Sequence, residues 1–486
     1  MEDEIRTVLS EELGDLATFG AEIPERYRRD WLSEQAVTPI AVIRPRTTED
    51  VSRALRLCSR LGISVVPQGG MTGLVGGAQP VAGGVALSLD RMTAIEEIDE
   101  VMATVTVEAG ATLGDVQRAC EQAGLFLAVD LGARDSCQVG GVISTNAGGN
   151  RVIRYGMTRE NVLGIEAVLS DGTIVTSLNK LLKNNAGYDL KQLLIGSEGT
   201  LGVVTRAVLR LHAQPQSFCS AFCGCADFAG VIGLLKAARS TLGAALTSFE
   251  VMWPSFYDFM CDGLPELRRS LAGRHGVYVL IEASGPAGQA RQSLEDLLAA
   301  EIDAGHIADA VLPKSERETT ELWAVRESVS EYGRLMGPLT GFDIGIPTGE
   351  AGAFVAEIEA ALARHWPDVH ALSYGHIGDS NLHLVVNVPS AGAHQPHDAL
   401  CDLVFEAVSR YGGTISAEHG IGTIKRDYLH LTRSPSELEV MARLKRALDP
   451  RGILNPGKVL APPHSATSQA VSPTVSPSAT PPSGPA

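Results

Sequence analysis

Residues 67–78 read PQGGMTGLVGGA, and this glycine-rich run directly follows an apolar stretch at 63–67 that is typical of a short buried strand. Glycine lets consecutive backbone N–H groups turn inward to bind an anion, and it lets the backbone approach a ligand that a Cβ atom would block. Because tight turns also use glycine, one such run by itself indicates either a turn or a ligand-binding loop.

Two more glycine-rich segments follow, VGGVISTNAGGNRVIRYG at 139–156 and IGSEGTLGVVT at 195–205. Three such loops, with Ser, Thr and Asn between the glycines, predict binding of a large phosphorylated cofactor. A nicotinamide site would need the spacing GxGxxG between a strand and a helix, and a P-loop would need GK[ST]. The first loop has neither pattern, so both alternatives are rejected.

The residues around the first loop alternate between helix and strand signals. Residues 47–48 offer a threonine cap for a helix that Gly62 ends, and ATVTVEA at 103–109 alternates as a strand does. Thr112 then begins a helix that ends at Gly124. These patterns predict an α/β arrangement for the first part of the chain.

The chain is expected to have five parts. These are an N-terminal helical segment at 1–37, a cofactor-binding domain at 38–213, a cap domain with a metal site at 214–440, a segment at 441–461 that packs back on the cofactor-binding domain, and a tail at 462–486. The tail is rich in Pro, Ser, Thr and Ala and almost uncharged, so we expect it to be disordered.

Composition excludes several classes of partner. The chain has 486 residues, a formal net charge of −17 and a pI near 5.2, so it would repel nucleic acids and anionic membranes. No window reaches the roughly 18 consecutive apolar residues of a membrane helix, and the acidic start lacks a signal-peptide pattern; we expect a cytoplasmic protein. The eight cysteines show no CxxC spacing, which argues against an iron–sulfur cluster and favours reduced packing residues.

A second set of polar residues lies in the last third of the chain. YGHIGDSNLH at 374–383 places His376 and His383 in a glycine turn that feeds a strand, and SAEHGIG at 416–422 supplies Glu418 and His419 at the end of another short strand. Any one of these histidines alone would more often be a surface or core residue. Two imidazoles and a carboxylate together are a common set of ligands for a divalent metal ion.

The three glycine segments resemble the flavin domain of the vanillyl-alcohol-oxidase or PCMH-type superfamily. The resemblance rests on PQGGMTGLVGG, DLGARDSCQVGGVISTNAGGNRVIRYG and NNAGYDLKQLLIGSEGTLGVVT in that order, and it covers roughly residues 38–460. Within the superfamily the chain is most similar to D-2-hydroxyglutarate, D-lactate and glycolate dehydrogenases. The fold class implied is α+β, with a two-subdomain PCMH-type FAD-binding domain and an α+β cap domain of the FAD-linked oxidase C-terminal type.

The resemblance implies FAD as cofactor. Because the first loop contains no histidine, the flavin should be non-covalent. The implied cofactor-binding residues are Pro67, Gly69, Gly70, Met71, Thr72, Gly73 and Leu74 in the first loop, Ser136, Gly140, Gly141, Thr145, Gly148, Gly149, Tyr155 and Gly156 in the second, Val203 and Val204 near the adenine side, and Asn455 near the end of the chain.

The resemblance also assigns His376, His383 and Glu418 as metal ligands, with zinc as the first choice and manganese or cobalt as alternatives. An α-hydroxycarboxylate would occupy the open metal positions, with hydride transfer to the flavin N5, and His419 would take the hydroxyl proton or support the metal. LWAVRES at 322–328 resembles the family segment whose arginine binds substrate, which is Arg326 here; the alternative is an exposed helix arginine.

The expected activity is the oxidation of a small D-2-hydroxy acid, with an electron-transfer flavoprotein or a quinone as acceptor. Close 2-hydroxyglutarate enzymes carry Thr, Lys and Asn where this chain has Ser330, Gly341 and Val385, which weakens the case for a dicarboxylate. A homodimer is expected only from the family. The alternatives are a metal-dependent hydrolase or lyase, the ether-lipid synthase branch, whose run of consecutive histidines is absent here, and a pure binding module.

Overall fold

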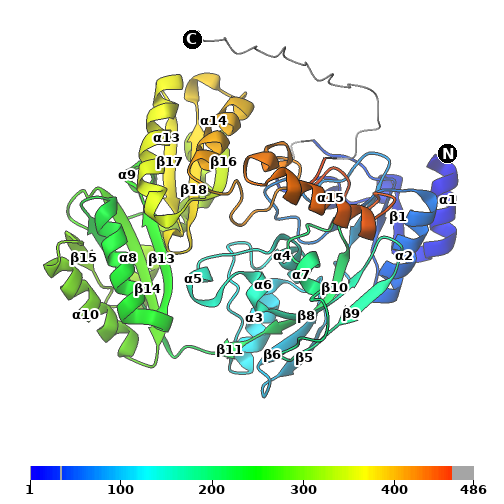
Figure 1. The fold of residues 1–486 in the computed structure, drawn as a ribbon, viewed down its shortest axis with the longest axis horizontal. Coiled ribbons are helices and arrows are strands. Elements are labelled where there is room, and N and C mark those ends of the chain that lie inside the picture. The colour runs from blue at the N-terminus through cyan, green and yellow to red at the C-terminus, as the bar shows by residue number, and fades with distance from the viewer. Residues whose placement is uncertain (1, 33–34, 462–486) are drawn as a thin grey trace, which may run out of the picture.

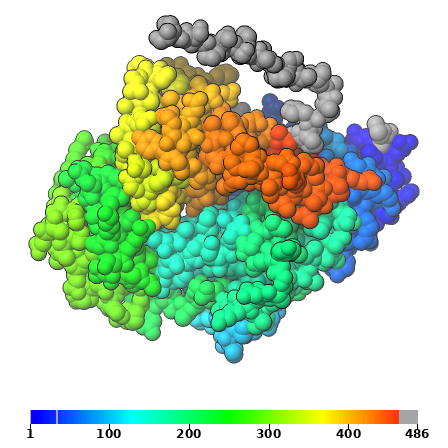
Figure 2. Space-filling model, in the orientation of Figure 1, coloured from blue at the N-terminus to red at the C-terminus, as the bar shows by residue number. Residues whose placement is uncertain are grey.

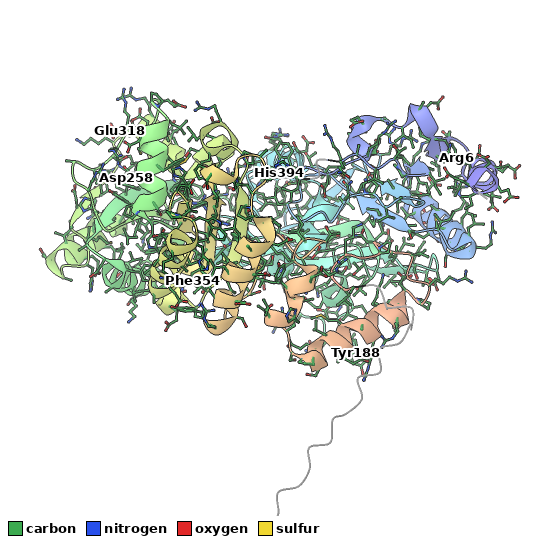
Figure 3. The ribbon with its side chains drawn as sticks, turned by 90° about the horizontal axis from the view of Figure 1, so that it is seen from above. Arg6, Tyr188, Asp258, Glu318, Phe354 and His394 are labelled. Atoms are coloured by element: carbon green, nitrogen blue, oxygen red, sulfur yellow. The ribbon has the colours of Figure 1, made fainter. Side chains whose placement is uncertain are left out.

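The computed structural model describes residues 2–32 and 35–461, so the predicted tail lies outside the described residues. The chain folds into two domains that lie side by side (Figure 1). Seen from above, Arg6 marks the far end of the first domain and Phe354 lies in the second (Figure 3). Among the described helices, none is both long enough and apolar enough to cross a membrane.

The first domain contains two larger sheets that share one hydrophobic core, and a two-stranded sheet of β7 (Leu125–Phe126) and β11 (His212–Ala213). In the smaller of the two larger sheets, of order β1-β2-β4-β3, strands β2, β4 and β3 are parallel and β1 is antiparallel to β2. The larger sheet, of order β5-β6-β10-β8-β9, is antiparallel throughout. The strands are β1 (Ala17–Phe19), β2 (Ala41–Ile43), β3 (Val65–Gln68), β4 (Val85–Ser88), β5 (Ile95–Asp99), β6 (Thr104–Glu108), β8 (Val162–Val168), β9 (Ile174–Ser177) and β10 (Val203–Arg210).

The predicted α/β arrangement therefore holds only for the smaller sheet, and the fold class is α+β with a PCMH-type FAD-binding domain and a cap domain. A short apolar or alternating stretch predicts a strand, but its direction relative to its neighbours depends on segments far away in the chain.

Helices of this domain are α1 (Glu2–Leu13), α3 (Leu113–Gln122), α4 (Val139–Thr145), α5 (Val152–Tyr155), α6 (Thr158–Asn161) and α7 (Lys191–Leu194).

The predicted helix caps are confirmed. Helix α2 spans Thr48–Leu61; the Thr47 side chain accepts a hydrogen bond from the Asp50 backbone N–H, and Gly62 ends the helix with a left-handed φ of 69°. Helix α3 begins in the same way at its predicted threonine. These caps place the first glycine loop directly after β3, because α2 covers the sheet and returns the chain to that strand.

The second domain is built on a seven-stranded antiparallel sheet of order β15-β12-β14-β13-β17-β18-β16. Helices α8, α10, α13 and α14 cover one face over a large apolar core. The other face carries a smaller apolar cluster under α9, α11 and α12. The strands are β12 (Ser217–Cys225), β13 (Leu246–Met252), β14 (Val277–Gly285), β15 (Asp309–Val311), β16 (Thr340–Gly345), β17 (His370–Gly375) and β18 (Asn381–Asn387).

The helices of this domain cover both faces of the sheet, and α5 of the first domain contacts β13. The helices of the second domain are α8 (Phe228–Leu242), α9 (Pro254–Gly263), α10 (Gln289–Asp303), α11 (Glu316–Glu327), α12 (Tyr332–Met336), α13 (Ala351–His365) and α14 (His397–Arg410). In the space-filling view the yellow part of this domain directly adjoins the cyan surface of the first domain (Figure 2).

The end of the described chain returns to the first domain. Helix α15 (Pro435–Leu448) lies over that domain in Figure 1. Beyond it, Leu454 bridges to Val65 at β3, and the Lys445 ammonium donates hydrogen bonds to the carbonyl oxygens of Thr200 and Leu454. The chain thus starts and closes on the first domain, with the second domain inserted between.

Candidate active site

The candidate site lies on the face of the seven-stranded sheet that carries the smaller apolar cluster. Because side chains alternate between the two faces of a strand, Asn381, His383 and Val385 of β18 point to the same face. The register places Asp343 of β16 on one side of His383 and Tyr374 of β17 on the other. Residues from three strands therefore form the floor of the site.

The three predicted metal ligands converge above this floor. One ligand atom each from His376, His383 and Glu418 lies within 4.8 Å of the other two. His376 is 5% exposed and His383 is 9% exposed, and both stand on a rigid strand–turn–strand unit. Two imidazole nitrogens and one carboxylate oxygen form the donor set of a metal centre with a position open to substrate, so these residues fit a divalent metal ion.

The predicted strand before Glu418 is absent. Thr414 makes an isolated bridge with Gly345 at the edge of β16, and the residues after it form bends. On the other side of this pair, Gly420 has a φ of 85° and Gly422 a φ of 52°, so the segment after His419 is not a strand either. Glu418 and His419 are therefore held by a loop, whose position depends on hydrogen bonds to other segments.

Glu250 of β13 holds one ligand and the predicted substrate arginine together. Its Oε1 accepts a hydrogen bond from His376 Nδ1 at 2.7 Å, and its Oε2 accepts one from Arg326 Nε at 2.8 Å. The Glu250 side chain is fully buried. Burial alone would raise its pKa, but the positive charges of His376 and Arg326 lower the pKa of Glu250 to about 2. The sequence pattern did not reveal this residue, because it lies in an ordinary strand 126 positions before His376.

Asp343 plays the corresponding part for the other two histidines. Its Oδ1 lies 3.9 Å from His383 Nδ1, and its Oδ2 lies 3.8 Å from His419 Nδ1 and accepts hydrogen bonds from the backbone N–H groups of Glu418 and His419. Burial alone would raise the pKa of Asp343, but the charges of His419, Lys425 and His383 hold it well below its usual value. This carboxylate was also missed from the sequence.

Asp343, Glu418 and His419 could be taken for a second metal site, because their ligand atoms also lie within 4.8 Å of one another. The Lys425 ammonium, however, lies 3.7 Å from Asp343 Oδ2 and is buried beside it. That oxygen already accepts two backbone hydrogen bonds. A metal ion here would be repelled by the ammonium and would have to displace these donors, so the residues of this second group fit a metal ion less well than His376, His383 and Glu418 do.

The two ligand histidines differ in their electrostatic surroundings. Burial alone would lower the pKa of His376, but the charge of Glu250 and its hydrogen bond raise that pKa to about 9. Burial lowers the pKa of His383 well below its usual value, and the nearby charge of His376 adds to this effect. Because His376 Nδ1 donates its hydrogen bond to Glu250, this ring could bind a metal ion only through Nε2, which lies 3.2 Å from Arg326 Nη2.

Arg326 is not the exposed helix arginine of the alternative interpretation. It lies at the end of α11, is 7% exposed, and its guanidinium stands over the Tyr374 ring, 4.7 Å from the ring centre. Its Nη2 lies 3.2 Å from His376 Nε2. Nε is held by Glu250 and Nη2 lies at the ligand cluster, so the guanidinium brings a charged donor of the kind that carboxylates prefer to this cluster.

The first domain reaches into this cluster through its glycine loops. Glu418 Oε1 accepts a hydrogen bond of 2.5 Å from the backbone N–H of Gly149, a residue of the second loop. In return, the buried Glu198 of the third loop accepts hydrogen bonds from the backbone N–H groups of Ile421 and Gly422, at 2.7 and 2.8 Å. The loop that carries Glu418 is thus clamped by two of the three segments predicted to bind the cofactor.

The glycine loops also contact one another, and several leave no room for a side chain. A Cβ atom on Gly70 would overlap the Ser136 carbonyl oxygen, and one on Gly149 would overlap the Asp130 carbonyl oxygen. Around Gly73 and Gly141, by contrast, nothing lies within 4 Å of such an atom. Bends of this kind, some tightly packed and some open, fit a site where backbone approaches an FAD diphosphate.

Other residues in the predicted cofactor set have mixed surroundings. Val203 and Val204 pack in the core at 2% and 3% exposure, so a cofactor at this strand would meet their backbone. The Asn455 side chain donates hydrogen bonds to the carbonyl oxygens of Gly77 and Glu198 and so ties two loops together. Tyr155 is half-buried, with its ring 4.7 Å from that of His212.

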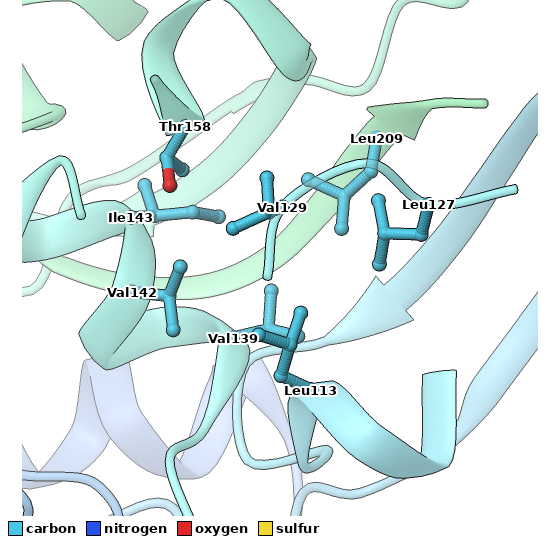
Figure 4. A pocket seen from close by; sticks show the side chains of 8 residues that line it. All are labelled: Leu113, Leu127, Val129, Val139, Val142, Ile143, Thr158 and Leu209. Carbon is cyan, nitrogen blue, oxygen red and sulfur yellow. The ribbon is translucent and has the colours of Figure 1, made fainter. Parts of the chain in front are cut away.

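Two cavities of the described chain differ in size and in the residues that line them. Behind α4 lies a gap of about 10 Å³, lined by aliphatic side chains such as Val142, Ile143 and Leu209 (Figure 4), which is at most the size of one water. A cavity of about 410 Å³ lies beside the ligand-bearing turns and is lined in part by Asp379 and Ala417. The core behind α4 is therefore closed, whereas the larger cavity is lined by neighbours of the candidate ligands in the chain and not by the ligands themselves.

Comparison with known proteins agrees with this architecture. Residues 39–177 match the family model described as FAD binding domain, and residues 214–459 match the one described as FAD linked oxidases, C-terminal domain. The solved structure of p-cresol methylhydroxylase with substrate bound has a TM-score of 0.76 at 17% identity and covers 94% of this chain and 96% of its own. An alkyldihydroxyacetonephosphate synthase structure has a TM-score of 0.72 at 17% identity, covering 94% of this chain and 84% of its own. These likenesses show the fold, that of a two-domain FAD-linked oxidoreductase of the PCMH type.

Curated relatives narrow the family. The mitochondrial D-2-hydroxyglutarate dehydrogenase of Bos taurus is 39% identical over 446 residues, which is 90% of this chain and 79% of that protein. The D-2-hydroxyglutarate dehydrogenase of Stutzerimonas stutzeri is 36% identical over 94% of this chain and 98% of its own length. The chain belongs to the family of FAD-dependent D-2-hydroxy-acid dehydrogenases.

Proposed function

We propose that this enzyme oxidises a small D-2-hydroxy acid that is bound to a divalent metal ion, zinc as first choice, held by His376, His383 and Glu418. The observation that carries the proposal is that these three ligand atoms lie within 4.8 Å of one another while Glu418 is hydrogen-bonded to Gly149 of a flavin-domain loop. Metal site and cofactor loops are therefore one structural unit. A metal-dependent hydrolase or lyase would have no use for the flavin domain.

The bound groups would supply two kinds of chemistry: the metal ion a Lewis acid that lowers the pKa of the substrate hydroxyl, and the flavin an acceptor for the hydride from C2. The protein handles the proton. The His419 side chain is 32% exposed, lies beside His383 and has its Nδ1 turned to the buried Asp343 carboxylate. Its other ring nitrogen is then free to accept the hydroxyl proton as a general base.

Arg326 would bind the substrate carboxylate. Glu250 holds the guanidinium in place through Nε, which keeps Nη2 beside His376 in the ligand cluster. A held guanidinium loses little freedom when it binds a carboxylate, so the hydrogen bonds contribute to affinity more fully. Lys425 is committed to Asp343 and to the Asp343 carbonyl oxygen, so we assign it no substrate role.

The substrate side chain would meet an uncharged part of the floor. Gly341 and Val385 are cross-strand partners on β16 and β18. They form the next pair on the same face of the sheet after Asp343 and His383. Neither offers a charge or a hydrogen bond to a second carboxylate. We therefore expect monocarboxylic D-2-hydroxy acids such as D-lactate to react better than D-2-hydroxyglutarate, the substrate named for the relatives. The electrons would pass on to an electron-transfer flavoprotein or a quinone.

The decisive experiment is anaerobic mixing of the purified flavoenzyme with a panel of D- and L-2-hydroxy acids while flavin bleaching is followed by stopped flow. We expect the D acids to bleach the flavin. His383→Ala should keep the flavin spectrum but lose bound metal and turnover, whereas His430→Ala, an exposed histidine bonded to the Asp427 carbonyl, should keep all three. Full activity of His383→Ala, or full activity after a chelator has removed all metal, would overturn the metal role.

A further inference from the structure

One polar side chain on the floor of the site has no partner. Asn381, the first residue of β18, is 4% exposed, and both its Oδ1 and its Nδ2 are buried without a hydrogen-bond partner among the residues that the structure describes. Folded proteins rarely leave a buried amide unpaired, because it gives up its hydrogen bonds to water and gains none in return. Such a group calls for an explanation by function.

Asn381 stands next to two of the metal ligands. It precedes His383 by two positions in the same strand and points to the same face of the sheet. Its backbone N–H donates to the His376 carbonyl oxygen at 3.2 Å, and its partner on β16 is Gly345, which has no side chain. The amide therefore stands on the face of the sheet that carries His383, with Thr414 packed beside Gly345.

A second asparagine in the same strand shows that the missing partner is a local property of the site. Asn387 is also on this face and is equally buried, at 3% exposure. Its Nδ2 donates a hydrogen bond of 2.7 Å to the Pro338 carbonyl oxygen. The fold thus satisfies the asparagine remote from the metal ligands, while the one beside them has both amide atoms unused.

The chemistry around Asn381 selects the kind of ligand. An amide oxygen is a poor choice for the ion, because a histidine-rich set favours zinc-like metals over the hard cations that amide oxygens bind. The flavin-domain residue that reaches the cluster, Gly149, bonds to Glu418 and not to β18. A carboxylate, in contrast, has about four acceptor sites, of which Arg326 and a metal ion together fill only part.

We propose that Asn381 is a substrate-binding residue whose Nδ2 donates a hydrogen bond to an oxygen of the α-hydroxycarboxylate. This inference rests on the proposed function, since only an acid bound at His376, His383 and Glu418 comes within reach of the amide. Arg326 offers the acid a charged donor and Asn381 offers it a neutral one. Asn381 therefore orients the acid without adding another charge to the buried cluster.

The test compares Asn381→Leu with the matched control Asn387→Leu. Each FAD- and metal-loaded variant is titrated with oxalate, whose two adjacent carboxylates chelate a metal as an α-hydroxycarboxylate does, and binding is followed by the flavin absorbance. KM is measured with the D acid that bleaches the wild-type flavin fastest, and metal content, FAD content and melting temperature are recorded for each variant.

For Asn381→Leu we expect the Kd of oxalate and the KM to rise at least tenfold, with metal and FAD content unchanged and a melting temperature no lower than that of the wild type. Asn387→Leu should show the reverse, a lower melting temperature with an unchanged KM. Asn381→Ser, which is smaller, should repeat the KM effect if the leucine variant folds poorly.

The inference falls if Asn381→Leu, or Asn381→Ser where the leucine variant folds poorly, binds oxalate within twofold of the wild type, or if the main effect of that variant is loss of metal or loss of FAD. These results leave the proposed function intact as long as the wild type holds metal and bleaches with a D acid. A wild-type enzyme that binds neither metal nor oxalate would instead refute the proposed function itself, and this inference with it.

Discussion

Glu250→Gln tests whether a buried carboxylate organises both the metal site and the substrate arginine. The substitution keeps the shape of the side chain, but glutamine has one carbonyl oxygen to offer where Glu250 now accepts from His376 Nδ1, Arg326 Nε and the Ser248 hydroxyl. At least one charged donor loses its acceptor. Arg326 also stays buried without its counter-charge, which costs about 3 kcal/mol or more of unfolding free energy.

This loss has two measurable consequences. At about 2–4 °C for each kcal/mol in a domain of this size, the melting temperature should fall by roughly 6–12 °C. His376 should lose its fixed orientation and the basicity that its acceptor provides. Outer carboxylates of this kind contribute about 10–100-fold to metal affinity, which corresponds to about 1.4–2.7 kcal/mol. The Kd for Zn²⁺ should rise by that factor.

The assay is competition for Zn²⁺ with a chromophoric chelator, together with a thermal melt and the flavin absorbance as a check on the first domain. Glu282→Gln is the control, because Glu282 lies in the neighbouring strand β14 opposite Ser248 and is bonded to Thr247 instead of the ligand cluster. It should leave the Kd for Zn²⁺ within twofold of the wild type. Equal metal affinity and equal melting temperature in Glu250→Gln and the wild type would refute the role given to Glu250.

Three further predictions concern the loops, the substrate and pH. Gly70→Ala should lower FAD content, because its Cβ overlaps the Ser136 carbonyl oxygen, whereas Gly73→Ala, with nothing within 4 Å, should not; equal FAD content by absorbance would contradict this. Arg326→Ala should raise KM by the factor that corresponds to a loss of about 1.5–3 kcal/mol of binding free energy, the value of a charged hydrogen bond. Steady-state kinetics with an unchanged KM would remove Arg326 from the site. Burial lowers the pKa of Lys458 from 10.5 to about 8, so the folded state loses this proton at a lower pH than the unfolded state does. The free energy of unfolding of the wild type, measured with urea, should therefore rise relative to that of Lys458→Met between pH 8 and pH 10.5. A difference that stays constant over this range would argue against the shifted pKa.

Much of this protein could be predicted from its sequence, because the signals concerned are local. A threonine before an apolar helical face and a glycine after it determine the bounds of α2 through bonds within a few residues of the chain. The glycine loops and the turn that carries His376 and His383 are equally local, since two imidazoles seven positions apart can meet through one strand–turn–strand unit. Cofactor class and ligand types followed from these stretches.

The partners of those residues could not be predicted in this way. Glu250 and Asp343 lie in strands whose sequences give no sign of a special role, and they become important only because the sheet order places β13 and β16 beside the histidines. The bond from Gly149 to Glu418 spans 269 positions. The strand expected before Glu418 was wrong for the same reason, because a loop held by distant hydrogen bonds leaves no periodic pattern.

The amino-acid sequence by itself thus determined which chemical groups this enzyme possesses and the short-range turns that present them. The tertiary structure alone decided which of those groups are paired, buried or left without a partner. Arg326, for example, is hydrogen-bonded to Glu250, whereas the amide of Asn381 has no partner among the described residues. The physical reason is that hydrogen bonding and charge act over a few ångströms in space, and strand register brings together residues that the chain keeps far apart.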